Sequence, residues 1–224
     1  MSCGERQGLA PVVEINWRAA HYHGNTHRVE RGETLYAIAF RYEKDYRQLA
    51  AINHLSSPYT LRVGQILNIQ SHSVSQQPRF VAQRYPSAAS RRVSTQPQRP
   101  ASYANSGWSW PIRGRVVATY APERGRKGID IAGRKGESIH AAASGVVAYS
   151  GNGLLGYGNL IIIRHDNQYL TAYGNNSKNL VREGQFVRAG QVIAQIGAVD
   201  RRFWGLHFEI RHSGKPMNPL IYLR

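Results

Sequence analysis

Three short stretches decide the fold of the second half of the chain: Arg126-Lys127-Gly128-Ile129-Asp130, Tyr173-Gly174-Asn175 and Gly205-Leu206-His207-Phe208-Glu209. They lie in a region, residues 108–224, where short apolar runs alternate with Gly-containing turns. Short strands with a turn about every ten residues are typical of a single antiparallel sandwich. The expected strands are Arg115 to Tyr120, Gly145 to Ser150, Asn159 to Arg164, Tyr169 to Tyr173, Gln191 to Gly197 and Leu206 to Arg211.

Together with their spacing, the three stretches resemble the LytM-type (lysostaphin-like) family of peptidoglycan metallo-endopeptidases. The family stretches read His-x-Gly-x-Asp, Tyr-x-His and His-x-His. In that family the first His, the Asp and the last His bind zinc, and the other two His serve the chemistry. The resemblance implies a mainly β, LytM-like C-terminal domain with a groove built on its strands and turns.

This chain departs from the family pattern at most of its functional positions. Carried over residue by residue, these positions hold Arg126, Asp130, Asn175, Gly205 and His207, of which only Asp130 and His207 match. A catalytic zinc normally takes three protein ligands, and arginine offers no lone pair because its guanidinium stays protonated. Asn175 and Gly205 cannot transfer a proton. The sequence therefore predicts no metal, no cofactor and no hydrolysis.

The same half of the chain contains three further histidines, His140, His165 and His212. None of them has a His or Glu at metal-ligand spacing, so each is expected to be a turn or strand-end histidine. Without a metal, we expect the Arg126 guanidinium to replace part of the zinc charge and to pair with Asp130. His207 is then either a groove histidine or a packed one.

A second module is predicted in residues 27–70. His27 to Glu30 form a short strand, Thr34 and Asp45 can each cap a helix with apolar residues at three- and four-residue spacing, and Ile66 to Ile69 form a closing strand. This order predicts a small α+β module of the β-α-α-β type.

The module resembles the LysM family through Arg31-Gly32-Glu33-Thr34-Leu35, Ala51-Ile52-Asn53 and Leu61-Arg62-Val63-Gly64-Gln65 taken together. That family binds the N-acetylglucosamine backbone of peptidoglycan or chitin, so the resemblance implies binding to glycan strands. A shallow groove between two loops suits a sugar chain. Its expected residues are Gly32, Glu33, Thr34 and Leu35 on one loop and Ser57, Pro58, Tyr59 and Thr60 on the other. Leu35 also fits the buried face of the helix, and Thr34 also fits a cap alone.

The composition changes between residues 71 and 107, which hold four Pro, five Arg and no acidic residue. Such a segment cannot bury enough apolar surface to fold alone, so we expect a disordered-type linker. Either its positive charge binds an anionic surface, or the segment is only a solvated tether. Residues 1–26 are polar and irregular and are expected to form an N-terminal tether.

The formal net charge of the 224 residues is +16, which implies attraction to a polyanion. The chain shows no basic helix, zinc finger or paired-aromatic RNA signature, so nucleic acid is not an expected partner. It also has no apolar run of about eighteen residues, so no membrane span is expected. A cell-wall polymer and anionic lipid headgroups remain as partners for the charge.

The single cysteine, Cys3, excludes an intrachain disulfide. Met1-Ser2-Cys3-Gly4 resembles the start of a mature bacterial lipoprotein in which Cys3 is acylated. No apolar segment precedes it, so the signal peptide is expected to be absent from this chain. This interpretation implies the periplasm, with an outer-membrane anchor at Cys3 as the membrane contact. A stray N-terminal thiol is the alternative.

A LysM module, a basic linker and a degenerate LytM domain, in this order, resemble the NlpD/ActS-type murein hydrolase activators of Gram-negative bacteria over roughly residues 27–224. In that family the LytM groove engages a periplasmic N-acetylmuramoyl-L-alanine amidase and relieves its autoinhibition, at the division septum or in damaged wall. The expected contact residues here are Arg126, Asp130, Tyr173, Asn175, Gly205 and His207, with Trp204 and Tyr157 on neighbouring loops.

Two other hypotheses fit the same sequence. One is an active zinc endopeptidase that cleaves peptidoglycan cross-bridges, and the other is a wall-anchoring protein that uses LysM alone. If the groove is closed at rest, the sequence offers two segments that could cover it, the linker and the loop from Arg182 to Ala189.

Overall fold

The computed structural model describes residues 24–70, 108–165, 168–199 and 203–224. Cys3, most of the tether and the whole of the linker lie outside these residues, so the expectations for them stay predictions, as do the domain boundaries. Within the described residues, no helix has the length and apolar character needed to cross a membrane.

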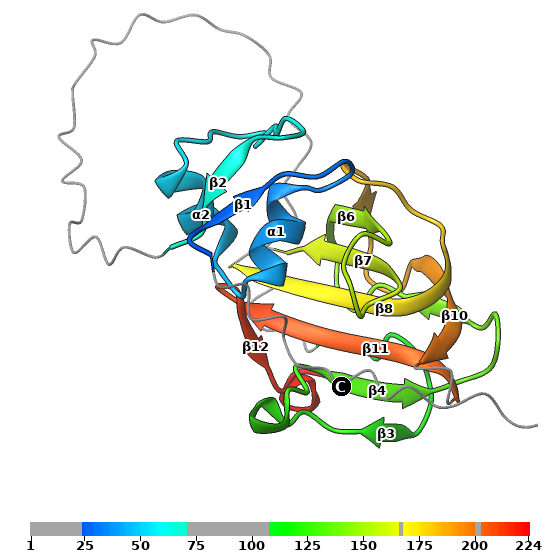
Figure 1. Cartoon of the computed structure of the whole chain (residues 1–224). Coiled ribbons are helices and arrows are strands. Elements are labelled where there is room, and N and C mark those ends of the chain that lie inside the picture. The colour runs from blue at the N-terminus through cyan, green and yellow to red at the C-terminus, as the bar shows by residue number, and fades with distance from the viewer. Residues whose placement is uncertain (1–23, 71–107, 166–167, 200–202) are drawn as a thin grey trace, which may run out of the picture.

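The first module has the predicted β-α-α-β order. Its two strands, β1 (Thr26–Arg28) and β2 (Ile66–Asn68), pair antiparallel, and between them lie α1 (Leu35–Arg41) and α2 (Tyr46–Ile52). Figure 1 shows the two helices packed beside this small ribbon. Each helix is only two turns long, so packing against its neighbours supplies most of its stability.

Both predicted helix caps are confirmed. The side chain of Thr34 accepts a hydrogen bond from the backbone N–H of Ala37, and the side chain of Asp45 accepts one from the backbone N–H of Arg47. Each cap satisfies a backbone donor in the first helical turn that has no partner within the helix. The helices therefore begin where the sequence indicates.

The C-terminal domain is an antiparallel sheet, which confirms the predicted mainly β fold. Within the described residues its order is β3-β4-β11-β10-β8-β7-β6-β9, while β12 pairs with β11 and β5 pairs with β10. The elements are β3 (Val116–Ala118), η2 (Pro122–Arg124), β4 (Ile129–Ala132), β5 (Ser138–His140), β6 (Gly145–Gly151), β7 (Asn159–Arg164), β8 (Tyr169–Asn179), β9 (Phe186–Val187), β10 (Val192–Val199), β11 (Phe203–His212), β12 (Lys215–Met217) and η3 (Pro219–Ile221).

Strand β11 pairs with β4 on one side and, from His207 to His212, with β8 on the other, which brings the three sequence stretches together. His207 is directly opposite Asp130 on β4 and opposite Gly174 on β8. Side chains two residues apart on a strand project to the same face. We call the face that carries His207 the motif face, and its members are His207, Glu209 and Arg211 on β11 and Gly174, Ala172 and Leu170 on β8.

The opposite face of these strands forms the domain core. Alternate residues of β11, namely Leu206, Phe208 and Ile210, are fully buried there together with Tyr173 of β8. This strict alternation fixes the register, since a one-residue slip would exchange the buried and the charged side chains of β11.

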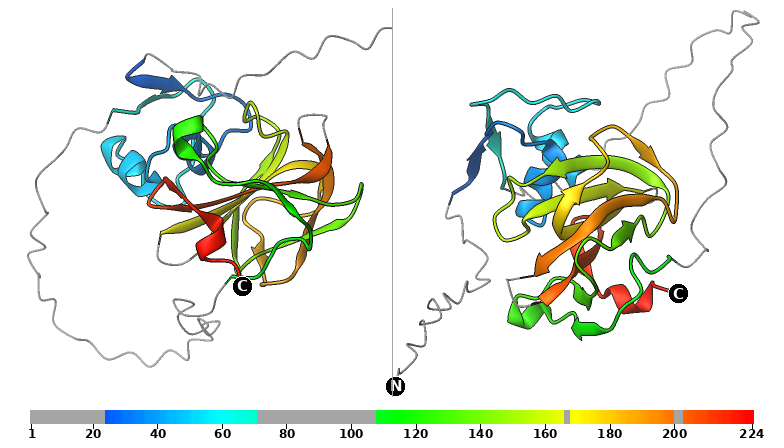
Figure 2. Two further views of the ribbon diagram at one scale, coloured as in Figure 1. Left: turned by 90° about the horizontal axis from the view of Figure 1, so that it is seen from below. Right: turned by 90° about the vertical axis from the view of Figure 1, so that its right-hand side faces the viewer.

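The LysM-like module lies against the motif face rather than apart from it. Helix α1 packs beside β6, β7 and β8, as Figure 1 and the right view in Figure 2 show. One continuous apolar cluster joins the two modules, with Ala37 and Phe40 of α1 packed on Ala148, Tyr149, Leu154, Leu160, Ile162, Leu170 and Ala172.

Candidate functional site at the motif face

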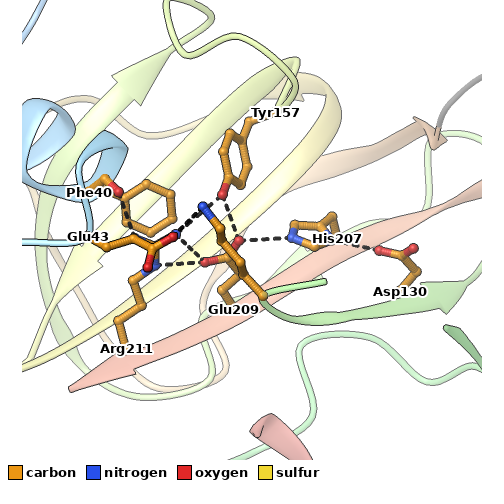
Figure 3. Close-up of polar contacts among 8 residues, drawn as sticks. Phe40, Glu43, Asp130, Tyr157, His207, Glu209 and Arg211 are labelled. Atoms are coloured by element: carbon orange, nitrogen blue, oxygen red, sulfur yellow. Dashed lines mark hydrogen bonds and ion pairs between the residues drawn. The ribbon is translucent and has the colours of Figure 1, made fainter. Parts of the chain in front are cut away.

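His207 lies between two carboxylates on the motif face. Its Nδ1 is 2.6 Å from Oδ1 of Asp130, and its Nε2 is 3.1 Å from Oε1 of Glu209 (Figure 3). Burial alone would lower the pKa of His207, but the hydrogen bonds to Asp130 and Glu209, together with their charges, outweigh burial and raise this pKa to about 9. At neutral pH the ring is therefore an imidazolium that donates from both nitrogens.

Glu209 continues the line of charges into the protein. Its Oε2 accepts a hydrogen bond from Nε of Arg211 at 2.8 Å, and its Oε1 accepts one from the hydroxyl of Tyr157 at 2.7 Å. Burial would raise the pKa of Glu209, but the charges of Arg211 and His207 hold it well below its usual range. Glu209 is thus a permanent anion in a site that excludes water.

Arg211 ends this line at the other module. Its side chain is 1% exposed, and its Nη1 donates to the backbone carbonyl of Phe40 on α1 at 2.6 Å. Its guanidinium carbon lies 3.4 Å from the centroid of the Phe40 ring. A buried charge needs both an ion partner and hydrogen-bond acceptors for its donors. Glu209 is the ion partner of Arg211, and the Phe40 carbonyl of α1 is an acceptor for its Nη1.

The site does not fit the zinc that the resemblance to LytM implies. A metal-bound histidine must offer a lone pair, whereas both nitrogens of His207 are engaged with carboxylates. Arg126 cannot act as a ligand at any accessible pH. Among residues 24–70, 108–165, 168–199 and 203–224, no group of three or more His, Cys, Asp or Glu side chains is placed to hold a metal ion.

The other histidines do not supply a missing ligand. His165 is buried, with its Nδ1 2.8 Å from the carbonyl oxygen of Ser144 and its Nε2 2.7 Å from the hydroxyl of Thr171. His140 pairs with Val192 between β5 and β10. His212 ends β11, and its ring lies against that of Tyr169.

The predicted pairing of Arg126 with Asp130 is wrong. Asp130 pairs with His207, because the register of β4 and β11 places these two residues directly opposite each other. Arg126 instead forms an isolated bridge with Ala121 through its backbone, and its buried Nε has no hydrogen-bond partner among the described residues. The buried Nε is therefore a donor that the described residues leave unsatisfied.

Gly205, which stands where the family has a catalytic histidine, is enclosed by backbone. A Cβ atom at this position would lie 2.4 Å from the carbonyl oxygen of Ile131 and 2.6 Å from the ring of Phe203. Strand β4 approaches β11 closely here, with Ala132 opposite Gly205. No side chain fits at this position without a backbone shift, so the pairing of β4 with β11 excludes a histidine here.

Asn175 occupies the position of the other family histidine and has a left-handed backbone with a φ of 62°. Its backbone N–H donates to the carbonyl of Tyr157 at 2.7 Å. Its side-chain Nδ2 is buried and has no partner within the described part of the chain. Like Arg126, Asn175 thus holds a buried donor that the described residues do not satisfy.

The remaining predicted groove residues divide into surface and core. Trp204 is 40% exposed, and the ammonium of Lys135 lies 5.2 Å from its ring centroid. Tyr157 is half-buried between Phe40 and His207. Tyr173 must be corrected: it is 0% exposed, and its hydroxyl accepts a hydrogen bond from the backbone N–H of Ala142. It supports the groove from the core and is not available to a partner.

The second predicted glycan loop is largely exposed, and one residue of the first loop must be corrected. Gly32, Ser57, Pro58 and Thr60 are exposed, and Tyr59 is half-buried against Tyr36 and Tyr46. Leu35 is 1% exposed in the module core, so it cannot touch a sugar. The apolar spacing of α1 points Leu35 inward.

The two remaining loop residues, Glu33 and Thr34, are already engaged within the protein. The carboxylate of Glu33 is held by His27 and Arg41. The hydroxyl of Thr34 caps α1 and also donates to the carbonyl of Ala148 at 3.2 Å.

Sequence reasoning missed Glu209, Arg211 and Phe40. A signal for the first two exists, because His207, Glu209 and Arg211 follow one another at intervals of two on a predicted strand and must share a face. Phe40 carries no such signal, since its partner lies 171 residues away in the sequence.

Comparisons with known proteins agree with this architecture. Residues 27–70 match the model of the LysM domain, and residues 124–219 match that of peptidase family M23. The chain is 40% identical to the "Lipoprotein NlpD/LppB homolog" of Pseudomonas aeruginosa, over 98% of this chain and 82% of that protein. It is 38% identical to the "Murein hydrolase activator NlpD" of Escherichia coli, over 90% of this chain and 68% of that protein. The solved structure of Helicobacter pylori Csd3 is 30% identical, with a TM-score of 0.48, over 52% of this chain and 33% of that one.

Proposed function

Because this chain belongs to the NlpD/LppB family of LysM- and M23-containing proteins, we propose that it activates a peptidoglycan hydrolase and does not cut peptidoglycan itself. Its role concerns peptidoglycan, as the name of the E. coli relative and the LysM module indicate. The LysM module binds the glycan strand, and the surface around His207 on the C-terminal domain binds the enzyme.

One observation carries the non-catalytic part of the proposal. The imidazole of His207 is closed between Asp130 and Glu209 and carries a proton at neutral pH. A zinc hydrolase needs free lone pairs at these positions and a proton-transfer group nearby. Arg126, Asn175 and Gly205 provide neither, so this face is suited to binding and not to hydrolysis.

The enzyme that we propose as partner is a periplasmic N-acetylmuramoyl-L-alanine amidase. The proposed contact surface comprises Arg126, Asp130, Asn175 and His207, with Trp204 and Tyr157 at its edge, while Gly205 is buried beneath it. Arg126 and Asn175 each hold a buried donor, Nε and Nδ2, that has no partner within the described residues, so a partner that opens this site would gain two hydrogen bonds. A partly exposed tryptophan is typical of a contact surface.

The same family membership supports a periplasmic location with an outer-membrane anchor. The relative from Pseudomonas aeruginosa is named a lipoprotein. We propose that acylated Cys3 provides the anchor and that the +16 net charge favours contact with the anionic cell wall.

The test is release of dye from labelled sacculi, with and without a purified amidase. We expect no release by this protein alone, slow release by the amidase alone and fast release by the two together. Release by this protein alone, abolished by a chelator, would instead show a zinc endopeptidase. Unchanged amidase activity would refute the activator function. A variant lacking residues 108–224 controls for wall binding through LysM alone.

A further inference from the structure

The motif face has a polar half and an apolar half, and helix α1 covers the apolar half. Leu170 and Ala172 share this face with Arg211 and Glu209, according to the register of β8 and β11. Both are buried beneath α1, where they join a cluster with Ala37 and Phe40. Phe40 is 1% exposed, a burial typical of a domain core and not of a loose contact between modules.

Polar contacts surround this apolar patch and hold α1 in place. At one end of α1, the hydroxyl of Thr34 donates to the carbonyl of Ala148 at 3.2 Å. At the other end, Nη2 of Arg41 donates to the carbonyl of Gly153 at 3.2 Å, and Glu43 forms an ion pair with Lys127. The last contact joins the helix directly to the sequence stretch that contains Arg126.

The covered half continues into the proposed enzyme-binding surface. The Phe40 ring lies 5.4 Å from that of Tyr157, and the Tyr157 ring lies 5.8 Å from that of His207. Figure 3 shows Phe40, Tyr157, Glu209 and His207 following one another along the face. An enzyme that binds the apolar half of the motif face as well as the polar half would therefore have to displace α1.

The LysM side of this contact is the predicted glycan loop. Thr34 belongs to the loop that we expect to face a sugar, and its hydroxyl is already shared between the cap of α1 and the carbonyl of Ala148. If a bound sugar takes the hydroxyl of Thr34, the hydrogen bond to Ala148 of β6 is lost. Glycan binding and the docking of α1 on β6 therefore both use the hydroxyl of Thr34.

We propose that the LysM module is an intramolecular cover of the motif face, and that glycan binding to this module releases it. The chain then exposes its whole enzyme-binding face only when it is on peptidoglycan. This inference rests on the proposed function for its biological outcome, but the release itself does not depend on any enzyme. A ligand shifts such an equilibrium only through a different affinity for the two states, and the shared Thr34 contact supplies that difference.

The release is tested by thiol labelling of the full chain with Cys3 replaced by Ser. Ala172→Cys places a thiol beneath α1, and Ser177→Cys places a control thiol on an exposed part of the same strand. We expect a saturating N-acetylglucosamine oligomer to speed labelling at position 172 about tenfold, with no effect at position 177. No effect at position 172, or no binding of the oligomer to the chain, would overturn the inference.

A charge exchange tests the same cover without a ligand. In the Ala172→Cys background, Glu43→Lys and Lys127→Glu each place like charges together, so each should raise thiol labelling at position 172 about tenfold, and the double exchange should restore slow labelling. Gln48→Lys adds one positive charge on the exposed side of α2, half of the change in Glu43→Lys, and should have no effect. Equal labelling in the single and double variants would contradict the inference.

The amidase assay then separates the two proposals. On a soluble N-acetylmuramoyl-peptide substrate, which lacks the N-acetylglucosamine strand, the single variants should activate the amidase more strongly than the unaltered chain, and the double exchange should not. If labelling responds as expected but no variant activates an amidase, the cover stands and the proposed function fails. If the Ala172→Cys chain with an intact ion pair activates fully while its thiol at position 172 stays protected, the cover is refuted and the function stands.

Discussion

The Cβ position of Gly205 lies 2.4 Å from the carbonyl oxygen of Ile131 on the neighbouring strand. This close approach ties the absent histidine to the strand geometry: β4 fills the space that a side chain would take. The backbone of the C-terminal domain thus leaves no room for this side chain. Replacing Gly205 by histidine would therefore not restore the family's catalytic site.

Gly205→Ala should therefore destabilise the domain although it adds only a methyl group. We expect a loss of about 1–3 kcal/mol in the free energy of unfolding, because β4 or the Phe203 ring must move. Chemical denaturation measures this loss. Gly24→Ala is the matched control, since a Cβ there meets only an ordinary contact at 3.6 Å. Equal stability of the two variants would contradict the close packing at Gly205.

The stability of the domain should fall as the pH rises through the pKa of His207. This pKa is raised from 6.5 to about 9 in the folded protein. The bound proton therefore stabilises the fold fully below pH 6.5, and this contribution is lost as the pH approaches 9. Its size is about 3 kcal/mol. His207→Gln, which does not titrate, should flatten the pH dependence between these values. An equally steep loss in the variant would refute the assignment.

The Arg211–Glu209 pair should behave as a coupled unit in a double-mutant cycle. Arg211→Met leaves Glu209 as a buried anion with fewer donors, and we expect it to cost about 3–5 kcal/mol. Combining it with Glu209→Gln removes both charges and should cost less than the sum of the single changes. Thermal unfolding of the four proteins gives the coupling energy. Additive effects would show that the two side chains do not stabilise each other.

Arg126→Ala should change binding and leave stability nearly unaltered. Its Nε makes no hydrogen bond to the described residues, so we expect a change below about 0.5 kcal/mol in unfolding free energy. Loss of this donor should weaken amidase activation severalfold in the sacculus assay. Arg124→Ala, an exposed neighbour, should preserve activation. A large loss of stability in Arg126→Ala would instead support an internal ion pair.

Much of the local structure could be predicted from particular residues. Thr34 and Asp45 cap their helices as expected, since a cap depends on residues only two or three positions apart. The four missed strands, β4, β5, β9 and β12, have two to four residues each. Strands this short carry too few residues for a period of two to be recognised, and pairing with their neighbours forms them.

The sequence by itself determined which groups are available at the site. The side chains of Arg126, Asn175 and Gly205 offer none of the usual zinc ligands (His, Cys or carboxylate) and no proton-transfer group in any fold. The tertiary structure alone decided how the remaining groups are paired. Asp130 meets His207, and Arg211 meets the carbonyl of Phe40, across 77 and 171 residues of sequence. Such pairs depend on strand register and on the docking of one module against another, and local sequence patterns contain neither.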